Sequence, residues 1–181
     1  MRKYIYLLII LLLIFAPAVL CQDQQPDSAQ SIIRTAISET KSTDDRIFVI
    51  FHASWCVWCK WLDAALESPE IKPIMKKYYT IARLDVKEFG EKIKKLENPG
   101  GRILLEEMDG TKSGLPFIAV LNRKGKMIAN SNVMPKNQNI GYPGSADEIA
   151  AFAKLLKTTA PRMTAKQIAV ITSYLKKNSP Q

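Results

Sequence analysis

The chain is organised around Ile47-Phe48-Val49-Ile50-Phe51-His52-Ala53-Ser54-Trp55-Cys56-Val57-Trp58-Cys59-Lys60. Its first five residues are all β-branched or aromatic, and such an unbroken run is typical of a central strand buried on both faces. Beyond Cys56 the apolar residues recur with helical spacing, so a helix is predicted to follow the strand. Two cysteines, Cys56 and Cys59, therefore lie at a junction between a buried strand and a helix.

The placement of Cys56 and Cys59 suits thiol chemistry. Unpaired backbone N–H groups and the positive end of the helix dipole stabilise a thiolate in the first turn of a helix. This lowers the pKa of the outer thiol, so Cys56 is predicted to be the exposed nucleophile near neutral pH. Cys59 lies one turn further on, is predicted to be more buried, and can attack a mixed disulfide formed at Cys56. The pair thus indicates a redox-active centre.

Other interpretations of the pair remain open. A structural disulfide is compatible with the motif, but a ring closed over so few residues constrains the unfolded chain little. A zinc site needs four ligands, and the sequence has no second Cys-x-x-Cys pair. Copper binding by the two cysteines with His52, the only histidine, and Met134 is a further hypothesis that the spacing does not demand. Redox chemistry is the favoured interpretation, and we expect no metal and no organic cofactor.

Further strands and helices are indicated on both sides of this stretch. Strands are predicted over 80–86, 116–121 and 126–130, the last two joined by the turn Asn122-Arg123-Lys124-Gly125. Helices are predicted over 28–41, 87–97, 146–157 and 164–177, and Ser68-Pro69-Glu70 indicates the start of a fresh helix. Helical crossovers between the first three strands predict a βαβ arrangement, whose strands run parallel, with helices on both faces of an α/β fold.

The amino terminus has the three parts of a secretory signal peptide. Arg2-Lys3 is followed by the apolar run Tyr4–Leu20, which contains small residues suitable for cleavage, and then by polar sequence. We therefore expect a signal peptide over 1–21, a linker over 22–27 and a single domain over 28–181.

The fate of this segment has alternatives. An uncleaved membrane anchor is the first, because the apolar run is at the short limit for a membrane span. Lipid attachment to Cys21 is the second, but Leu20 stands where that processing prefers a small residue. Whether Cys21 is removed, lipidated or free stays open. In each case we expect export, to the periplasm or outside the cell, where cysteines meet an oxidising compartment.

The composition fits an ordinary globular domain. Of the 181 residues, 47% are hydrophobic and 24% are charged, which leaves enough material for a core without disulfide staples. The formal net charge is +9, but the lysines are spread over several segments, and no aromatic-and-basic nucleic-acid motif accompanies them. We expect a monomer that does not bind nucleic acid.

Two separated motifs give the chain a family resemblance. Trp55-Cys56-Val57-Trp58-Cys59-Lys60 after a buried strand, and Gly114-Leu115-Pro116-Phe117 before a later one, resemble the active-site segment and the cis-proline loop of thioredoxins. The hairpin and the helix that follow also fit, so the resemblance covers about 46–156 and is nearest to the exported thioredoxin-like proteins. It implies a thioredoxin fold, with a mixed sheet of about four strands flanked by helices, and the helix predicted over 164–177 is an extra C-terminal helix.

The resemblance also implies roles for individual residues. Pro116 is expected to be cis and to lie beside Cys56, which leaves the backbone of Leu115 free to pair with a substrate strand. Trp55 is expected to shield one side of the site. Trp58 is either an apolar platform for partner polypeptides or a helix residue packed on its own domain, and exposure would favour the platform.

Three features depart from the thioredoxin pattern. Ile50 occupies the strand position where thioredoxins carry a buried acid that assists proton transfer to the resolving thiol. Val57-Trp58 replaces the usual Gly-Pro between the cysteines. The segment 87–113 is longer than in a compact thioredoxin, and it either sets partner choice or is an inert insertion.

The leading hypothesis is an exported thiol–disulfide oxidoreductase that exchanges disulfides with exported proteins carrying disulfides or thiols. Cys56 attacks, Cys59 resolves, and the reductase, isomerase or oxidase direction is set by a reduction potential that the sequence leaves open. A reductant in an oxidising compartment needs an electron donor, such as a membrane partner. The alternative is a protein-binding module that presents Trp58, Leu115 and the segment 87–113 to a client beside a passive disulfide, with copper handling as a less favoured third hypothesis.

Overall fold

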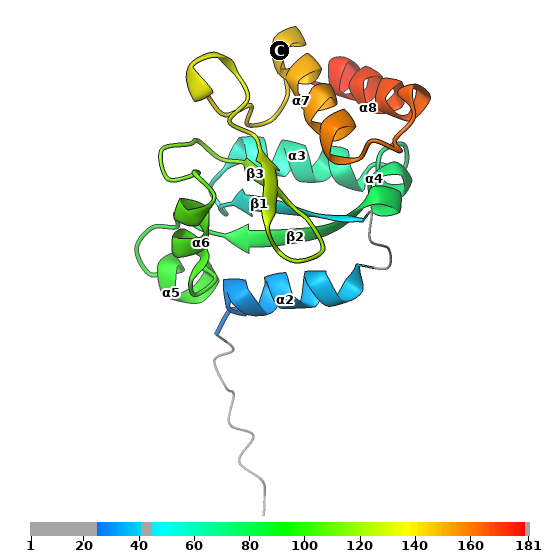
Figure 1. Ribbon diagram of the computed structural model, residues 1–181. Coiled ribbons are helices and arrows are strands. Elements are labelled where there is room, and N and C mark those ends of the chain that lie inside the picture. The colour runs from blue at the N-terminus through cyan, green and yellow to red at the C-terminus, as the bar shows by residue number, and fades with distance from the viewer. Residues whose placement is uncertain (1–24, 41–44, 180–181) are drawn as a thin grey trace, which may run out of the picture.

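The structure is a computed structural model that describes residues 25–40 and 45–179 (Figure 1). The expected signal peptide or anchor over 1–21 and the first residues of the linker lie outside the described residues. Within the two described ranges, no helix combines the length and the apolar character that crossing a membrane requires.

Four strands form one mixed sheet in the order β2-β1-β3-β4. Their bounds are β1 Arg46–His52, β2 Tyr79–Asp85, β3 Phe117–Leu121 and β4 Met127–Asn130. β1 pairs parallel with β2 and antiparallel with β3, and β3 pairs antiparallel with β4. The mixed sheet of four strands agrees with the resemblance to the thioredoxin fold.

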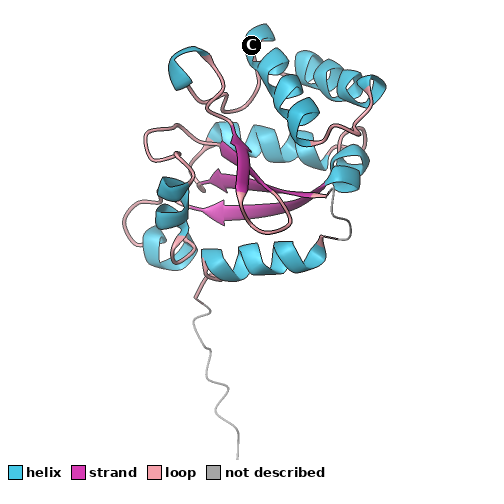
Figure 2. Ribbon diagram, viewed as in Figure 1, coloured by secondary structure: helices cyan, strands magenta, loops and turns pink. Residues whose placement is uncertain are grey.

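Helices cover both faces of this sheet (Figure 2). They are α2 Ala29–Glu39, α3 Val57–Glu67, α4 Lys72–Tyr78, α5 Lys92–Leu96, α6 Gly101–Glu107, α7 Ala146–Thr159 and α8 Ala165–Asn178, with a short 3-10 turn over Pro135–Asn137. In Figure 1, α2 lies on one side of the sheet, and α3, α7 and α8 lie on the other. The extra C-terminal helix predicted over 164–177 is α8.

β1 supplies both halves of the hydrophobic core, because successive side chains of a strand point to opposite faces. Phe48 and Ile50 belong to the cluster that contains α3, α4, α7 and α8. Ile47, Val49 and Phe51 belong to the cluster that contains α2 and α6. All five side chains are fully buried, which confirms the prediction of a strand buried on both faces.

The predicted parallel direction of the third strand is wrong, since β3 runs antiparallel to β1. A helix rises about 1.5 Å per residue. The five residues of α5 and the seven of α6 therefore span only about 8 and 11 Å, whereas a strand as long as β2 spans about 23 Å. Helices of this length do not carry the chain back along the sheet, so β3 begins at the edge where β2 ends.

The predicted helix over 87–97 is also only partly present. The structure keeps α5 alone, because Lys87 and Gly90 both have positive φ angles, of 57° and 56°, that a right-handed helix does not accommodate. The chain breaks as predicted near Ser68, whose hydroxyl donates to the carbonyl oxygen of Ala65 at the end of α3. The next helix, α4, starts a few residues later than the sequence indicates.

Candidate active site

Three loops meet at one edge of the sheet. The last residues of β1 and β2, His52 and Asp85, are paired in the parallel ladder. Phe51, near the end of β1, is paired with Phe117, the first residue of β3. Because β3 is antiparallel, the segments after β1, after β2 and before β3 all leave the sheet at this edge. A parallel β3 would have placed the cysteine loop and the proline loop at opposite ends.

The first loop carries the cysteine pair. Cys56 and Cys59 form a disulfide with a Cα–Cα distance of 5.3 Å. Cys56 is the N-cap of α3, and its Sγ accepts the backbone N–H of Cys59 at 3.1 Å. The sulfur thus lies at the unpaired N–H groups and the positive end of the helix dipole, which stabilise negative charge on it when the pair is reduced.

The expectation of an exposed Cys56 is wrong for this disulfide-bonded state, since Cys56 is only 3% exposed and Cys59 is also buried. The disulfide holds the Cys56 sulfur against the first turn of α3. Ala53 and the partly buried Leu115 pack with the two cysteines in one small cluster. Leu115 thus packs directly on the disulfide.

The second loop carries the proline. The Leu115–Pro116 peptide bond is cis, as the resemblance implies, and Leu115 contacts the cysteine cluster. The side-chain amide of Asn139 donates to the carbonyl oxygens of Gly114 and Pro116 at 2.8 and 2.9 Å. Asn139 therefore holds this loop from both sides of Leu115. Sequence reasoning missed Asn139, because it lies in a stretch that predicts only an irregular loop.

Aromatic side chains surround the cysteines. Trp55 is 46% exposed, its indole N–H donates to the carbonyl oxygen of Lys87 at 2.9 Å, and its ring packs on Phe89. Trp58 is 50% exposed and stacks on Tyr142. Trp58 thus has features of both hypotheses, since its ring packs on its own domain while half of its surface stays exposed to solvent. Phe89, 68% exposed, was not singled out from the sequence.

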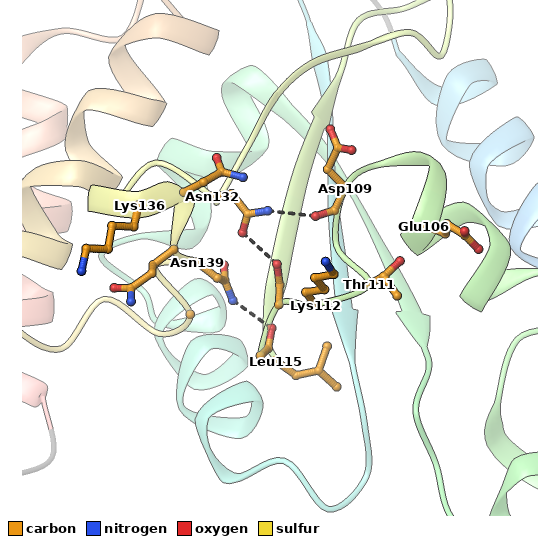
Figure 3. A pocket seen from close by; sticks show the side chains of 13 residues that line it. Glu106, Asp109, Thr111, Lys112, Leu115, Asn132, Lys136 and Asn139 are labelled. Carbon is orange, nitrogen blue, oxygen red and sulfur yellow. Dashed lines mark hydrogen bonds between the residues drawn. The ribbon is translucent and has the colours of Figure 1, made fainter.

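Two grooves adjoin Leu115. The larger, of about 1010 Å³, lies between the loop that precedes β3 and the loop that follows β4 (Figure 3). Asn132 joins these loops, because its amide donates to the carbonyl oxygen of Asp109 and accepts the hydroxyl of Ser113. The second groove, of about 560 Å³, is lined by Trp58 and Leu115. Leu115 thus lines both grooves, the first of which is largely polar while the second has the aromatic side chain of Trp58 in its wall.

His52, at the end of β1, lies beside a carboxylate. Its Nε2 lies 3.7 Å from Oδ1 of Asp85. Burial raises the pKa of the Asp85 carboxyl, and the nearby His52 opposes that rise. Ile50 is fully buried in β1, so no acid occupies the strand position that thioredoxins use. Among the described residues, no group of three or more His, Cys, Asp and Glu side chains gathers to hold a metal ion.

The third loop contains a buried acid that sequence reasoning missed. Glu88 follows β2 and is 1% exposed. Its carboxylate accepts the backbone N–H of Ser54 and, at 2.9 Å, the Ser54 hydroxyl. Ser54 directly precedes Trp55 and Cys56, so Glu88 contacts the cysteine loop. An acid within a lysine-rich segment is ordinarily read as solvated, and the sequence carries no signal that distinguishes it.

Comparison with known proteins gives one family and several similar folds. The family described as Thioredoxin-like matches residues 29–123, just over half of the chain. No curated protein sequence matches. A disulphide isomerase from Xylella fastidiosa Temecula1 is 19% identical, with 84% of this chain and 92% of that chain covered and a TM-score of 0.48.

Two further solved structures are similar to about the same degree. The DsbH oxidoreductase is 21% identical over 76% of this chain and 85% of that chain, with a TM-score of 0.46. A thioredoxin from Thermus thermophilus is 15% identical over 80% of this chain and 92% of that chain, with a TM-score of 0.45. At these identities the likeness concerns the fold alone.

Proposed function

The chain belongs to the Thioredoxin-like family, and from this we propose that it exchanges disulfides with exported proteins through Cys56 and Cys59. One observation carries the proposal: the Cys56–Cys59 disulfide lies at the start of α3, in contact with the residue before a cis-proline. A passive staple has no need of the helix terminus, whereas a nucleophilic thiolate is stabilised by it.

In the reducing direction the exchange proceeds in two steps. The Cys56 thiolate attacks one sulfur of a substrate disulfide, forms a new S–S bond to it, and releases the other substrate sulfur as a thiolate. The Cys59 thiolate then attacks the Cys56 sulfur, closes the Cys56–Cys59 disulfide and releases the second substrate thiolate. Two electrons pass from the enzyme dithiol to the substrate disulfide, and an external dithiol restores the reduced enzyme. The oxidising direction is the reverse.

The surroundings of the pair give substrate-binding residues in this proposal. Leu115 packs against the cysteines and lines both grooves, so a polypeptide that reacts at Cys56 contacts it in this proposal. The backbone of Leu115 then pairs with the substrate, and cis-Pro116 keeps an N–H donor away from the sulfurs. Trp58 provides an apolar surface on one side, and Trp55 covers another.

Export is part of the proposal and rests on the amino-terminal sequence. The charged start and the apolar run that follows support a signal peptide or an anchor, and hence a periplasmic or secreted domain. There the partners are proteins with disulfides or thiols, and a membrane-bound donor supplies electrons if the protein acts as a reductant. The mass of the mature protein, compared with that of the full chain, tests this proposal and reports the fate of Cys21.

Reduction of insulin with dithiothreitol as the electron donor tests the activity. The wild-type protein is expected to accelerate precipitation of the reduced insulin chains, and Cys56→Ser is expected to abolish the acceleration. In the full chain, Cys21→Ser is the matched control, because it removes the one cysteine outside the pair, and it is expected to retain full activity. Activity that survives in Cys56→Ser contradicts the mechanism. The reduction potential of the pair then assigns the direction.

The exposed aromatic side chains support a second candidate, a protein-binding module. Trp55, Trp58 and Phe89 all present a large part of their surface beside the disulfide. If binding alone is the function, a variant with both Cys56→Ser and Cys59→Ser still retains client proteins with wild-type affinity, and the insulin assay shows no activity in any variant.

A further inference from the structure

The dipeptide Lys87-Glu88 contacts both halves of the active site. The ladder between β1 and β2 ends at the pair His52 and Asp85. Val86, the next residue, donates its backbone N–H to the carbonyl oxygen of His52 at 2.8 Å, and the dipeptide follows directly. Glu88 turns inward from this edge, and its carboxylate accepts both the N–H and the hydroxyl of Ser54. One buried side chain thus fixes the residue two positions before Cys56.

Lys87 makes the complementary contacts. Its carbonyl oxygen accepts the indole N–H of Trp55, so a second residue of the cysteine loop is held by the same dipeptide. Its ammonium group donates to the carbonyl oxygens of Thr111 and Ser113 at 3.0 and 2.9 Å. Those two carbonyls belong to the loop that leads into Leu115. Lys87 therefore spans from the cysteine loop to the proline loop.

The dipeptide is itself held from the outer side. The backbone N–H of Glu88 donates to the carboxylate of Glu97 at 2.7 Å, and Arg102 donates to the Glu88 carbonyl oxygen at 3.3 Å. Arg102 also pairs with Glu97, with a shortest N–O distance of 2.6 Å. Burial alone would raise the pKa of Glu97, but the bonds from Arg102 and from Glu88 outweigh it and lower that pKa. These contacts hold Lys87 in its left-handed backbone conformation.

We propose that Lys87 and Glu88 are positioning residues, which fix the loop of Cys56 and the loop of Leu115-Pro116 relative to each other. The inference rests on the proposed function. It assigns a role to the first two residues of the segment 87–113, for which the sequence left open either partner choice or an inert insertion. Reacting sulfurs must approach in line and at close range, and a misplacement of about 1 Å can lower a rate by about 100-fold. Neither residue needs to touch the substrate.

Alkylation of the fully reduced protein by iodoacetamide tests Glu88 without any protein substrate. Glu88→Ala removes both acceptors that hold Ser54. We expect the pH midpoint of Cys56 alkylation in this variant to differ from that of wild type, and the kcat of insulin reduction to fall by about 10-fold or more. Glu88→Gln retains the shape and one carbonyl acceptor for the Ser54 N–H, so we expect it to restore most of the rate. Glu107→Ala, an exposed acid of α6, is the matched control.

Lys87→Met tests the other half, because it keeps the aliphatic stem and removes only the donors to Thr111 and Ser113. We expect the KM for insulin to rise several-fold with little change in kcat, since the proline loop binds substrate. Lys94→Met, on the exposed face of α5, is the control and is expected to leave both constants unchanged. This variant keeps the proposal testable if Glu88→Ala does not fold.

Each outcome of these experiments either supports or rejects the proposal. A positioning role of Glu88 is rejected if Glu88→Ala has the alkylation midpoint and the insulin-reduction kcat of wild type, whether or not its Tm is lower. It is also rejected if Glu88→Gln is as impaired as Glu88→Ala, because that result would indicate a charge effect. A KM unchanged in Lys87→Met rejects the role of Lys87. If wild type reduces no insulin, the proposed function fails, and the alkylation midpoint of the Glu88 variants still reports on positioning.

Discussion

The rings of Trp58 and Tyr142 stack with their centroids 6.1 Å apart and an interplanar angle of 22°. Tyr142 is buried, and it comes from the loop between β4 and α7, whereas Trp58 lies between the two cysteines in the first turn of α3. One face of the Trp58 ring is thus fixed by the domain, and the rest of the ring forms a rigid apolar surface next to the disulfide.

Trp58→Ala is expected to raise the KM for a protein disulfide several-fold, because a stacked indole provides apolar contact area at little cost in side-chain entropy. Reduction of a small disulfide such as oxidised glutathione is expected to change less, since a small molecule buries less apolar area against the ring than a polypeptide does. The ratio of kcat/KM for insulin to that for the small disulfide is the measurement. An equal loss with both substrates would place the effect on the thiol chemistry instead of on binding.

Cys59→Ser is expected to accumulate a covalent complex with the substrate. Without the second thiol, the mixed disulfide formed at Cys56 has no internal nucleophile to resolve it. Incubation of the reduced variant with an oxidised protein substrate, followed by a non-reducing gel, displays the complex as a band that dithiothreitol removes. Cys56→Ser is the control and forms no such band. A complex that forms through Cys59 in that control would reverse the roles assigned to the two cysteines.

Gly110→Ala is expected to destabilise the fold by about 1–3 kcal/mol through overpacking. A Cβ at this position would lie 2.3 Å from Cδ1 of Leu105 and 2.8 Å from the ring of Phe117, and both side chains are fully buried. Gly114→Ala is the matched control in the same loop, because a Cβ there meets no atom within 4 Å. Urea unfolding measures both variants, and equal stabilities would contradict the packing argument.

The buried hydroxyl of Tyr79 is expected to lower the free energy of unfolding at alkaline pH. Burial raises its pKa from 10.0 to about 12, although its hydrogen bond with Thr159 opposes the rise. Between these two values the unfolded tyrosine loses its proton while the folded one keeps it, so the free energy of unfolding falls as the pH rises. The pKa difference of 12 − 10.0, about two units, corresponds to about 3 kcal/mol by pH 12.

The same effect has a direct control in Tyr79→Phe. This variant lacks the titrating hydroxyl, so its free energy of unfolding is expected to fall less steeply than that of wild type from pH 10 upward. It also loses the bond to Thr159 and starts from a lower value at neutral pH, by about 1 kcal/mol. Urea unfolding at a series of pH values gives both curves. Parallel curves would mean that other groups cause the alkaline loss.

Much of the fold was predictable where one local pattern determines the structure. The five buried residues of β1 form a single apolar run, and that run alone predicts a strand covered on both faces. α7 carries its start signal in four residues, because Ser145 and Glu148 form a capping box. The cis bond at Leu115–Pro116 followed from the family resemblance of a short motif.

The errors arose where tertiary contacts override the local pattern. Apolar residues recur at helical spacing among the lysines of 87–97. Glu88 is nevertheless buried against Ser54, and the left-handed Lys87 before it prevents a helix from starting there. The direction of β3 depends on how far α5 and α6 carry the chain, which periodicity does not report. The burial of Cys56 follows from contacts with Leu115, which is distant in sequence.

The antiparallel placement of β3 has a consequence for folding. Cys56 and Cys59 are close in the chain whether or not it is folded, so oxygen or another disulfide can join them in a nascent polypeptide. Pro116 and Lys87 reach them only after loop closures that cost entropy and slow the folding reaction. Oxidation of the pair is therefore no marker of a native molecule, whereas the contact of the pair with Leu115 forms only once β3 has joined the sheet.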